Sequence, residues 1–136
     1  MPFTVAVIDE AGYGRLDAAR ATGLCATAFS LRGLDTGRMG EVSVALVEPD
    51  TIRDLNQEFR GKDEPTDVLS FLLDGPHGEM VGEVVICPAC AELVIDELVV
   101  HGALHLSGMD HPEDFEGSEM ARVQQVVMGA VHDAEK

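Results

Sequence analysis

Several segments of the chain have the pattern of β-strands: apolar residues alternate with polar ones or cluster in short runs. Residues 3–9 and 41–48 are rich in β-branched side chains, as strands usually are. Two more apolar runs, at 68–73 and 80–87, are separated by the turn-forming segment 74–78. The pattern therefore predicts four strands, of which the last two form a hairpin.

Between and after these strands, apolar residues recur at helical spacing. This spacing predicts four helices, over residues 17–32, 51–60, 89–107 and roughly 113–132. Asp17 and Asp50 are the expected N-caps of the first two helices, and Pro88 is expected to begin the third. The third helix is apolar on most of its surface, which indicates a helix buried at the centre of the fold.

The order of these elements, β-α-β-α-β-β-α-α, contains no internal repeat and no linker between domains. A chain of 136 residues suits one domain and can bury a core without disulfides. We therefore expect residues 1–136 to form a single α/β domain of the α+β type. It would have a small mixed four-stranded sheet and about four to five helices.

The composition of the chain indicates the cellular compartment in which it works. No apolar run is long enough to cross a membrane, and the N-terminus lacks the basic and apolar regions of a signal peptide. The three cysteines, an odd number, fit a reducing environment better than a disulfide framework. These features predict a cytoplasmic protein that does not enter a membrane.

The net charge of −16 argues against a nucleic-acid partner, but the charge is unevenly distributed. Residues 1–62 carry seven Lys and Arg against nine Asp and Glu, whereas residues 63–136 carry two against sixteen. No Lys or Arg occurs between Lys62 and Arg122. A phosphate-bearing ligand would therefore have to be bound by arginines of the first half and by any bound metal ion.

Three of the five histidines fall within residues 101–111. His101 and His105 are four residues apart, so a helix would place both imidazoles on one face. Gly108 can end that helix in the left-handed conformation and let the chain return His111 to the same point. Three histidines around an open coordination position are typical of catalytic zinc, although single histidines are more often surface or core residues.

The same spacing occurs in the metzincin proteases, whose motif is H-E-x-x-H-x-x-G-x-x-H. The chain has Gly102 where those proteases have the glutamate that activates the zinc-bound water, so peptide hydrolysis would need another base. Asp110 is a candidate to orient one of the ligand imidazoles from behind, or it is a loop residue that caps the following turn. The histidine cluster thus predicts a zinc site without predicting proteolysis.

Two further segments carry candidate chemistry. Arg60 could bind a phosphate or stabilise charge that develops on phosphorus, or it could be a solvated loop charge together with Lys62. Cys87 and Cys90 form a C-x-x-C pair at the predicted junction of a strand and a helix. A helix N-terminus would lower a thiol pKa and suit a redox dithiol, but two small buried residues are the more common outcome.

Together these residues resemble a known family, the bacterial rRNA maturation factor and endoribonuclease YbeY. Residues 101–111 match the family pattern H-G-x-L-H-L-x-G-x-D-H at every fixed position. Residues 55–60 and 63–71 are similar to its L-N-x-x-[YF]-R and D-x-P-T-D-V-L-S-F patterns, and residues 82–86 resemble its G-D-I-x-I strand. The chain departs from the family in the segment 87–100, which is usually longer and carries an extra helix or loop.

The resemblance implies that His101, His105 and His111 bind one zinc ion and that Arg60 contacts RNA phosphate. It implies a zinc-dependent, single-strand-specific endoribonuclease that matures the 3′ end of 16S rRNA and takes part in ribosome quality control. The implied partners are single-stranded rRNA, the small ribosomal subunit and assembly factors such as an Era-type GTPase. The alternatives are a non-catalytic ribosome-assembly factor with a structural metal and a metallohydrolase of non-RNA substrates.

Overall fold

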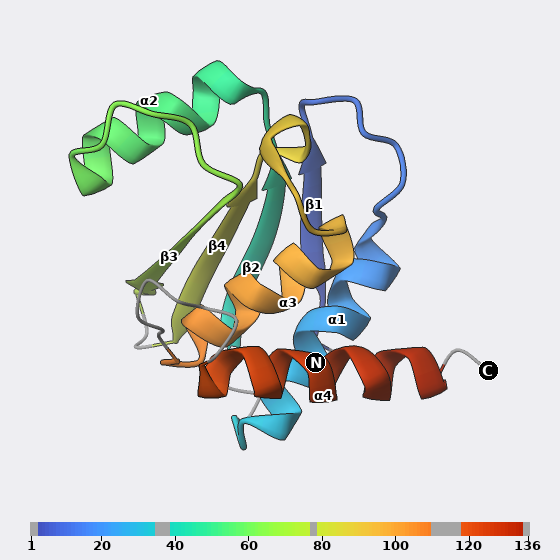
Figure 1. Cartoon of the computed structure of the whole chain (residues 1–136). Helices are drawn as coiled ribbons and strands as arrows, with labels where there is room; N and C mark the ends of the chain where they lie inside the picture. The colour runs from blue at the N-terminus through green and yellow to red at the C-terminus, as the bar shows by residue number, and fades with distance from the viewer. Residues whose placement is uncertain (1–2, 35–38, 77–78, 110–117, 135–136) are drawn as a thin grey trace.

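The computed structural model describes residues 3–34, 39–76, 79–109 and 118–134. Within them lie four strands, four α-helices and one short 3-10 helix (Figure 1). In chain order they are β1 (Val5–Asp9), α1 (Ala18–Leu31), β2 (Met39–Leu46), α2 (Pro49–Arg60), β3 (Val68–Asp74), β4 (Met80–Ile86), η2 (Pro88–Cys90), α3 (Ile95–Leu106) and α4 (Glu119–Ala134).

The strands form one mixed sheet in the order β1-β2-β4-β3. β1, β2 and β4 are parallel to one another, whereas β3 lies antiparallel to β4 at the sheet edge. The hairpin register pairs Val68 with Ile86 and Asp74 with Met80. The predicted fold class, with a small mixed four-stranded sheet and a hairpin, is confirmed.

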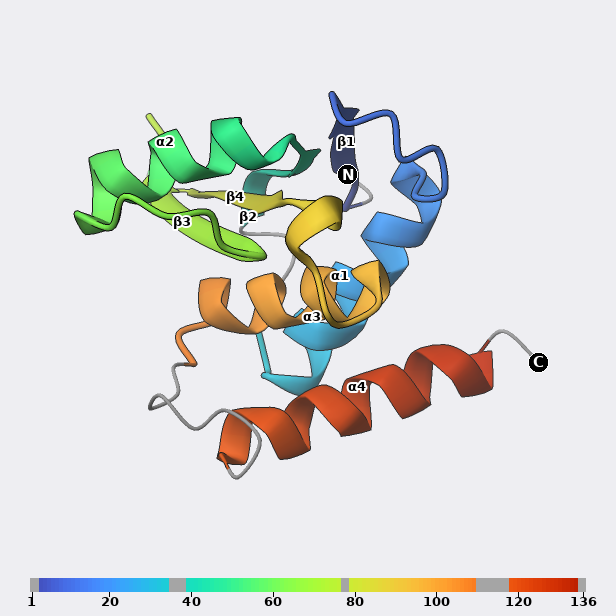
Figure 2. The same cartoon turned by 45° about the horizontal axis from the view of Figure 1, so that its top comes forward.

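Helices cover the two faces of the sheet unequally (Figure 2). α1 and α3 pack together beneath the sheet, and α4 lies outside them. The larger apolar core lies on this side and includes Phe29, Leu104 and Met120. On the other face, α2 covers a smaller cluster in which Ile52 packs with Leu69 of β3. The central helix α3 is therefore enclosed between the sheet and two other helices, as its apolar sequence predicts.

Two glycines allow α3 to approach β4 closely. An ideal Cβ added to Gly102 would lie 2.5 Å from Val84 Cγ1, and one added to Gly82 would lie 2.8 Å from Leu106 Cδ1. Carbon atoms at optimal separation are about 3.5–4.0 Å apart, so larger residues would not fit without movement. An ion pair between Arg20 of α1 and Asp96 of α3, with Nε and Oδ2 2.9 Å apart, ties the neighbouring helix to α3.

Several predicted helix boundaries differ from the structure. The predicted helix over 89–107 is two elements, because Ala91 adopts an extended conformation (φ −84°, ψ 131°) that ends the 3-10 turn begun by Pro88. The chain needs this break to turn from the end of β4 onto the face of the sheet, and α3 then begins at Ile95.

The capping residues were predicted correctly at only one of two helices. Asp17 caps α1, since its carboxylate accepts a hydrogen bond from the Arg20 backbone N–H at 2.8 Å. Asp50 is not the cap of α2, because Pro49 already occupies its first turn and Glu48 stands at the N-cap. At α4, the predicted start near 113 lies outside the described residues.

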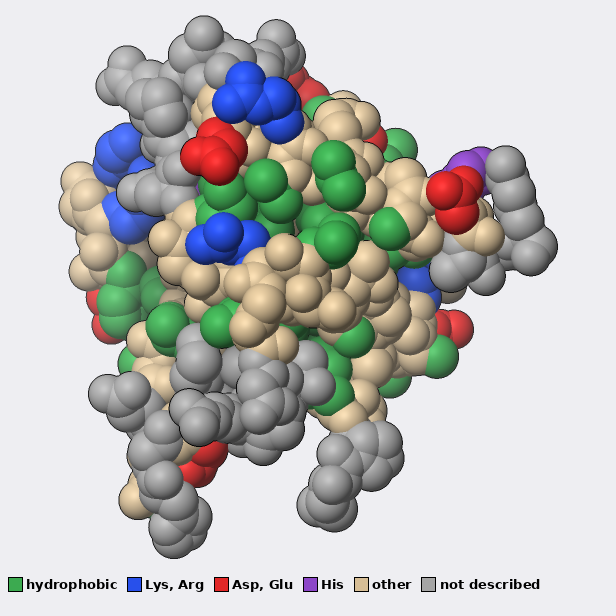
Figure 3. Space-filling view, turned by 90° about the horizontal axis from the view of Figure 1, so that it is seen from below, with side chains coloured by type: hydrophobic (Ala, Val, Ile, Leu, Met, Phe, Trp, Pro, Cys, Tyr) green, Lys and Arg blue, Asp and Glu red, His purple; other side chains and the backbone are tan. Residues whose placement is uncertain are grey.

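The described surface gives two further facts. None of the described helices is both long enough and apolar enough to span a membrane. On the face shown in Figure 3, the described Lys and Arg side chains are interspersed with Asp and Glu and form no continuous basic patch. Because acidic side chains lie among the basic ones, that face is poorly suited to bind the phosphate backbone of a nucleic acid.

Candidate active site

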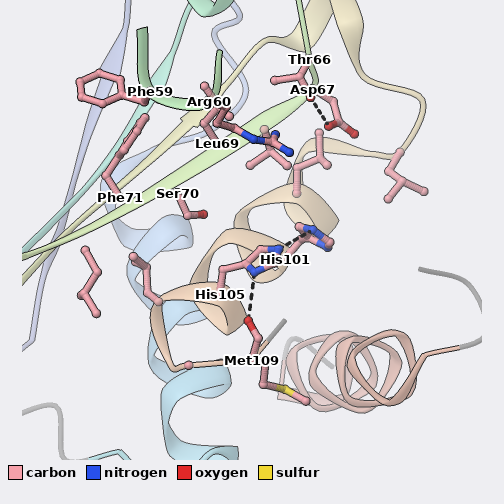
Figure 4. Close-up of a pocket in the computed structure, with 16 residues that line it drawn as sticks. Phe59, Arg60, Thr66, Asp67, Leu69, Ser70, Phe71, His101, His105 and Met109 are labelled. Atoms are coloured by element: carbon pink, nitrogen blue, oxygen red, sulfur yellow. Dashed lines mark hydrogen bonds between the residues drawn. The ribbon is translucent and has the colours of Figure 1, made fainter. Parts of the chain in front are cut away.

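A cleft of about 980 Å³ opens between the edge strand β3, the C-terminal half of α3 and the end of α2. Residues 66–72 form one wall, while α3 contributes His101 and His105 to the other (Figure 4). Phe59 and Arg60, the last two residues of α2, also line it. Two of the three predicted ligands and the predicted phosphate-binding arginine therefore share one cleft.

The two histidines face each other through their Nε2 atoms, which are 3.2 Å apart. His101 is 8% exposed, and its Nδ1 lies 3.1 Å from Gln124 Oε1. The Nδ1 of His105 lies 3.0 Å from the backbone oxygen of Met109. Both Nδ1 partners are acceptors, and neutral rings that donate to them through Nδ1–H direct their Nε2 lone pairs toward each other.

Two facing lone pairs fit a bound cation. Zn–N bonds are about 2.0–2.1 Å, so two imidazole nitrogens on one tetrahedral zinc are about 3.3 Å apart. The observed separation of 3.2 Å between His101 Nε2 and His105 Nε2 matches that spacing. The described residues contain no group of three or more His, Cys, Asp and Glu that could hold a metal ion. The predicted third ligand, His111, and Asp110 lie outside the described residues.

The turn after α3 builds part of this arrangement. Gly108 has φ +99° and donates its N–H to His105 O at 3.0 Å, and Met109 donates to Leu104 O at 3.1 Å. These two bonds form a Schellman motif, which needs a left-handed residue where Gly108 stands. The turn brings the carbonyl of Met109 back to His105, so the predicted glycine stop also orients a metal-ligand candidate.

Gln124 is a candidate site residue that the sequence analysis did not identify. It lies on α4, is 1% exposed, and reaches across to His101 in the neighbouring helix. The one available signal is its position on the otherwise apolar face of α4, between Met120 and Val127. A buried polar side chain on an apolar stripe needs a partner, and here the partner is a candidate ligand.

Arg60 is directed into the cleft by the way α2 ends. Gly61 has φ +70° and closes the helix in a left-handed turn. In the loop beyond it, Asp63 Oδ1 accepts a hydrogen bond from Arg53 Nε at 2.8 Å, and this hydrogen bond together with the Arg53 charge lowers the pKa of the Asp63 carboxyl. Asn56 donates to the backbone oxygen of Glu64 at 2.9 Å. These hydrogen bonds fix the loop that follows Arg60. Lys62, in that loop, is not among the residues that line the cleft.

The comparisons with known proteins agree with the motifs. The family model described as "Endoribonuclease YbeY" matches residues 17–132. The chain is 69% identical over 132 residues to "Endoribonuclease YbeY" of Rubrobacter xylanophilus, covering 96% of this chain and 98% of that protein. The protein of the same name from Carboxydothermus hydrogenoformans is 41% identical over 116 residues, covering 76% and 81%.

The chain belongs to the YbeY family. Among solved structures, the solution structure of TM1509 from Thermotoga maritima is similar, with 28% sequence identity and a TM-score of 0.53. That match covers 96% of this chain and 90% of the other. The family resemblance of the sequence is thereby confirmed, and the fold is shared along nearly the whole chain.

In this YbeY-family chain, the position of the metzincin glutamate has no room for a side chain. Gly102 is buried against β4, where an added Cβ would lie 2.5 Å from Val84 Cγ1 and 3.1 Å from Ser70 Oγ. A glutamate at this position would collide with Val84 unless the helix or that side chain moved. The packing of α3 on β4 therefore does not accommodate the glutamate of the protease motif.

In this family member the two sulfur atoms of the C-x-x-C pair lie close together, but the thiol pKa of Cys90 is raised instead of lowered. Cys87 Sγ and Cys90 Sγ are 3.1 Å apart. The hydrogen bond with Cys87 and burial raise the pKa of the Cys90 thiol to about 11. Burial alone raises the pKa of Cys25 to about 12, in the core of the other layer. The direction is opposite to that expected from a helix N-terminus, which lowers a thiol pKa.

Cys90 is therefore expected to react slowly with iodoacetamide near neutral pH. Because its folded pKa is raised, the thiolate fraction should grow about tenfold per pH unit until the pH approaches the pKa. Labelling followed by peptide mass spectrometry measures the rate. Cys87→Ala removes the hydrogen bond and should speed labelling of Cys90, while rapid labelling of the wild type near neutral pH would contradict the raised pKa.

Proposed function

We propose that this protein is a zinc-dependent, single-strand-specific endoribonuclease that acts in rRNA processing. The observation that carries the proposal is that Arg60 and the His101–His105 pair open into the same cleft. Endoribonuclease activity is further supported by the name of the Rubrobacter xylanophilus relative, which matches 96% of the chain. Three nitrogen ligands with an open position suit catalysis better than a closed structural site.

In this proposal His101 and His105 bind the ion through Nε2, and His111 is the third ligand. Gln124 and the Met109 carbonyl accept hydrogen bonds from the two Nδ1–H groups, which would keep both Nε2 lone pairs directed at the ion. When bound, a zinc ion would supply a positive charge suited to polarising a phosphoryl oxygen or to lowering the pKa of a coordinated water.

Arg60 supplies the complementary charge. Its guanidinium donates two parallel hydrogen bonds to the phosphate oxygens of RNA and stabilises the charge that grows on them during cleavage. Among the lining residues that the structure describes, it is the one Lys or Arg. The proposal therefore assigns the positioning of the scissile phosphate to Arg60 and to the ion.

The cellular role is the finer part of the proposal. We infer maturation of the 3′ end of 16S rRNA and ribosome quality control in the cytoplasm, with the small ribosomal subunit and an Era-type GTPase as partners. The competing possibility is an assembly factor whose metal is structural. It would bind small-subunit particles without cutting RNA, even after the metal is removed.

The test is cleavage of single-stranded oligoribonucleotides, including the 3′ end of 16S rRNA, by purified protein. Arg60→Ala is expected to lower kcat by about 100-fold, because removal of one donor to a developing charge costs about 10²–10³. Arg60→Lys should recover part of the loss, since lysine keeps the charge without the two-pronged geometry.

Arg122→Ala provides the matched control, because Arg122 is exposed on α4 and does not line the cleft. It should cleave at the wild-type rate. Equal activity in Arg60→Ala and wild type would remove Arg60 from the mechanism. Activity that also survives exhaustive chelation would indicate a contaminating nuclease and contradict the proposal.

A further inference from the structure

An aromatic side chain is exposed inside the cleft next to the proposed phosphate-binding arginine. Phe59 is 59% exposed although it lines the cleft, and it directly precedes Arg60 on α2. Its ring meets that of Phe71 on β3 edge-on, with centroids 5.0 Å apart and an interplanar angle of 63° (Figure 4). Edge-to-face contact of this kind joins the edge of one ring to a face of the other, and Phe59 still keeps more than half of its surface exposed.

The charge of the cleft makes this ring important for binding RNA. The chain has a net charge of −16, and among the described lining residues Arg60 is the one cation while Asp67 is an acid. Most proteins that bind single strands combine a basic groove with aromatic platforms on which bases stack. Here the described cleft has very little basic charge, so aromatic stacking must contribute more of the affinity for RNA.

We propose that Phe59 stacks on an unpaired nucleobase of the RNA while Arg60 contacts the phosphate beside it. This inference rests on the proposed function and deepens it. A base in a duplex is covered on both faces by its neighbours, so a stacking platform accepts only a base that is free of them. The preference for single strands then originates in Phe59, and it should be nearly independent of sequence because every base has a π-face.

A purely structural role for Phe59 is the alternative, in which its contact with Phe71 only fastens α2 to β3. The two roles predict different effects on RNA binding when Phe59 is replaced by an apolar residue with or without an aromatic ring. Leucine keeps an apolar side chain against Phe71 but offers no aromatic face, whereas tryptophan offers a larger one. Stacking therefore predicts opposite effects on RNA binding for these two replacements, and a fastening role does not.

The experiment measures KM and kcat of the zinc-loaded protein on single-stranded RNA. Phe59→Leu is expected to raise KM by about tenfold, within the range of about five- to 150-fold for loss of one stacked base. Its kcat should change less than twofold, and Phe59→Trp should keep or lower KM. Val126→Ala is the matched control, since Val126 is 60% exposed on α4 and outside the cleft.

A second measurement removes the base instead of the ring. A set of oligoribonucleotides, each with one abasic residue, should contain one position at which the wild-type KM rises about tenfold. At that position Phe59→Leu should show no additional loss, because ring and base act as a pair. The abasic series uses the wild type alone, so it stands even if Phe59→Leu fails to fold.

Three results separate the possible failures. An unchanged KM in Phe59→Leu, or an abasic series without a sensitive position, would overturn the stacking site while leaving RNA cleavage intact. Additive losses from Phe59→Leu and the abasic residue would also overturn it. A wild-type protein that cleaves no RNA would contradict the proposed function itself.

Discussion

Replacement of His105 by alanine is expected to remove zinc binding and to reduce RNA cleavage to background. The Nε2 atom of His105 lies 3.2 Å from that of His101, at the spacing of two ligands on one ion. Loss of a hydrogen-bonding partner behind a ligand already costs about 10–100-fold in metal affinity. Loss of the ligand itself should therefore exceed about 100-fold, as measured by competition with a chromophoric chelator.

Gln124→Met provides a graded comparison. It keeps an unbranched side chain of similar volume on α4 but removes the acceptor of His101 Nδ1. Zinc affinity should fall by about 10–100-fold while the fold is retained. Zinc should raise the thermal midpoint of the wild type and, at higher concentration, of Gln124→Met, because binding to the folded state alone stabilises it. It should not do so for His105→Ala.

The result that would contradict this assignment is specific. It is the purification of His105→Ala with one zinc per chain and wild-type affinity, together with unchanged zinc affinity in Gln124→Met. Such a protein would hold its metal elsewhere, and the 3.2 Å separation of the two Nε2 atoms would be only a packing contact between two rings. Loss of cleavage without loss of zinc would instead assign His105 a role in the chemistry.

Features that arise from neighbours in sequence were predictable. The Asp17 cap depends on a side chain that reaches the N–H three residues later, and the turn at Gly108 depends on a residue that tolerates positive φ. The hairpin of β3 and β4 also follows from two apolar runs joined by a short turn. In each case the interacting groups lie within one element or one connection.

Features that arise from distant segments were not predictable in the same way. Gln124 is 23 residues from His101, and nothing local to either residue pairs them before α4 packs on α3. The break at Ala91 was missed because the apolar periodicity continues through it, while the direction of the chain is set by the position of the sheet. The grouping of Arg60 with the histidines was suggested by motif resemblance alone; its geometry depends on α2 and α3 both flanking β3.

The net charge of the chain differs in character from the charge of its cleft. A net charge of −16 speaks against nucleic acid, and the described face in Figure 3 has no continuous basic patch. The cleft nevertheless combines one arginine, two facing imidazoles and an exposed phenyl ring. A single strand can be bound by these few groups, whereas a long duplex would need many phosphate contacts.

The second large effect is expected at Gly102, where alanine should destabilise the protein by about 2 kcal/mol. Alanine favours a helix over glycine by about 1 kcal/mol, but overpacking a core typically costs about 1–3 kcal/mol. The added Cβ would lie 2.5 and 2.9 Å from the two methyl groups of Val84, a stiff β-branched residue on the buried strand β4. The cost should therefore be at the upper end and outweigh the gain.

Gly23→Ala is the matched control, because Gly23 lies within α1 and an added Cβ would have no atom within 4 Å. This variant should be more stable than the wild type by about 0.5–1 kcal/mol. Urea unfolding of both variants should thus give shifts of opposite sign. Val84→Ala should lessen the effect of Gly102→Ala, since it removes the methyl groups that the new Cβ meets.

Equal stabilisation by Gly102→Ala and Gly23→Ala would contradict the close approach of α3 to β4. The expected result has a consequence for function. If even a methyl group is costly at Gly102, a glutamate cannot be accommodated there while His101 and His105 keep their position in the cleft. The close approach of α3 to β4 at Gly102 therefore both positions the helix that carries the histidine pair and leaves no space for the glutamate of the protease motif.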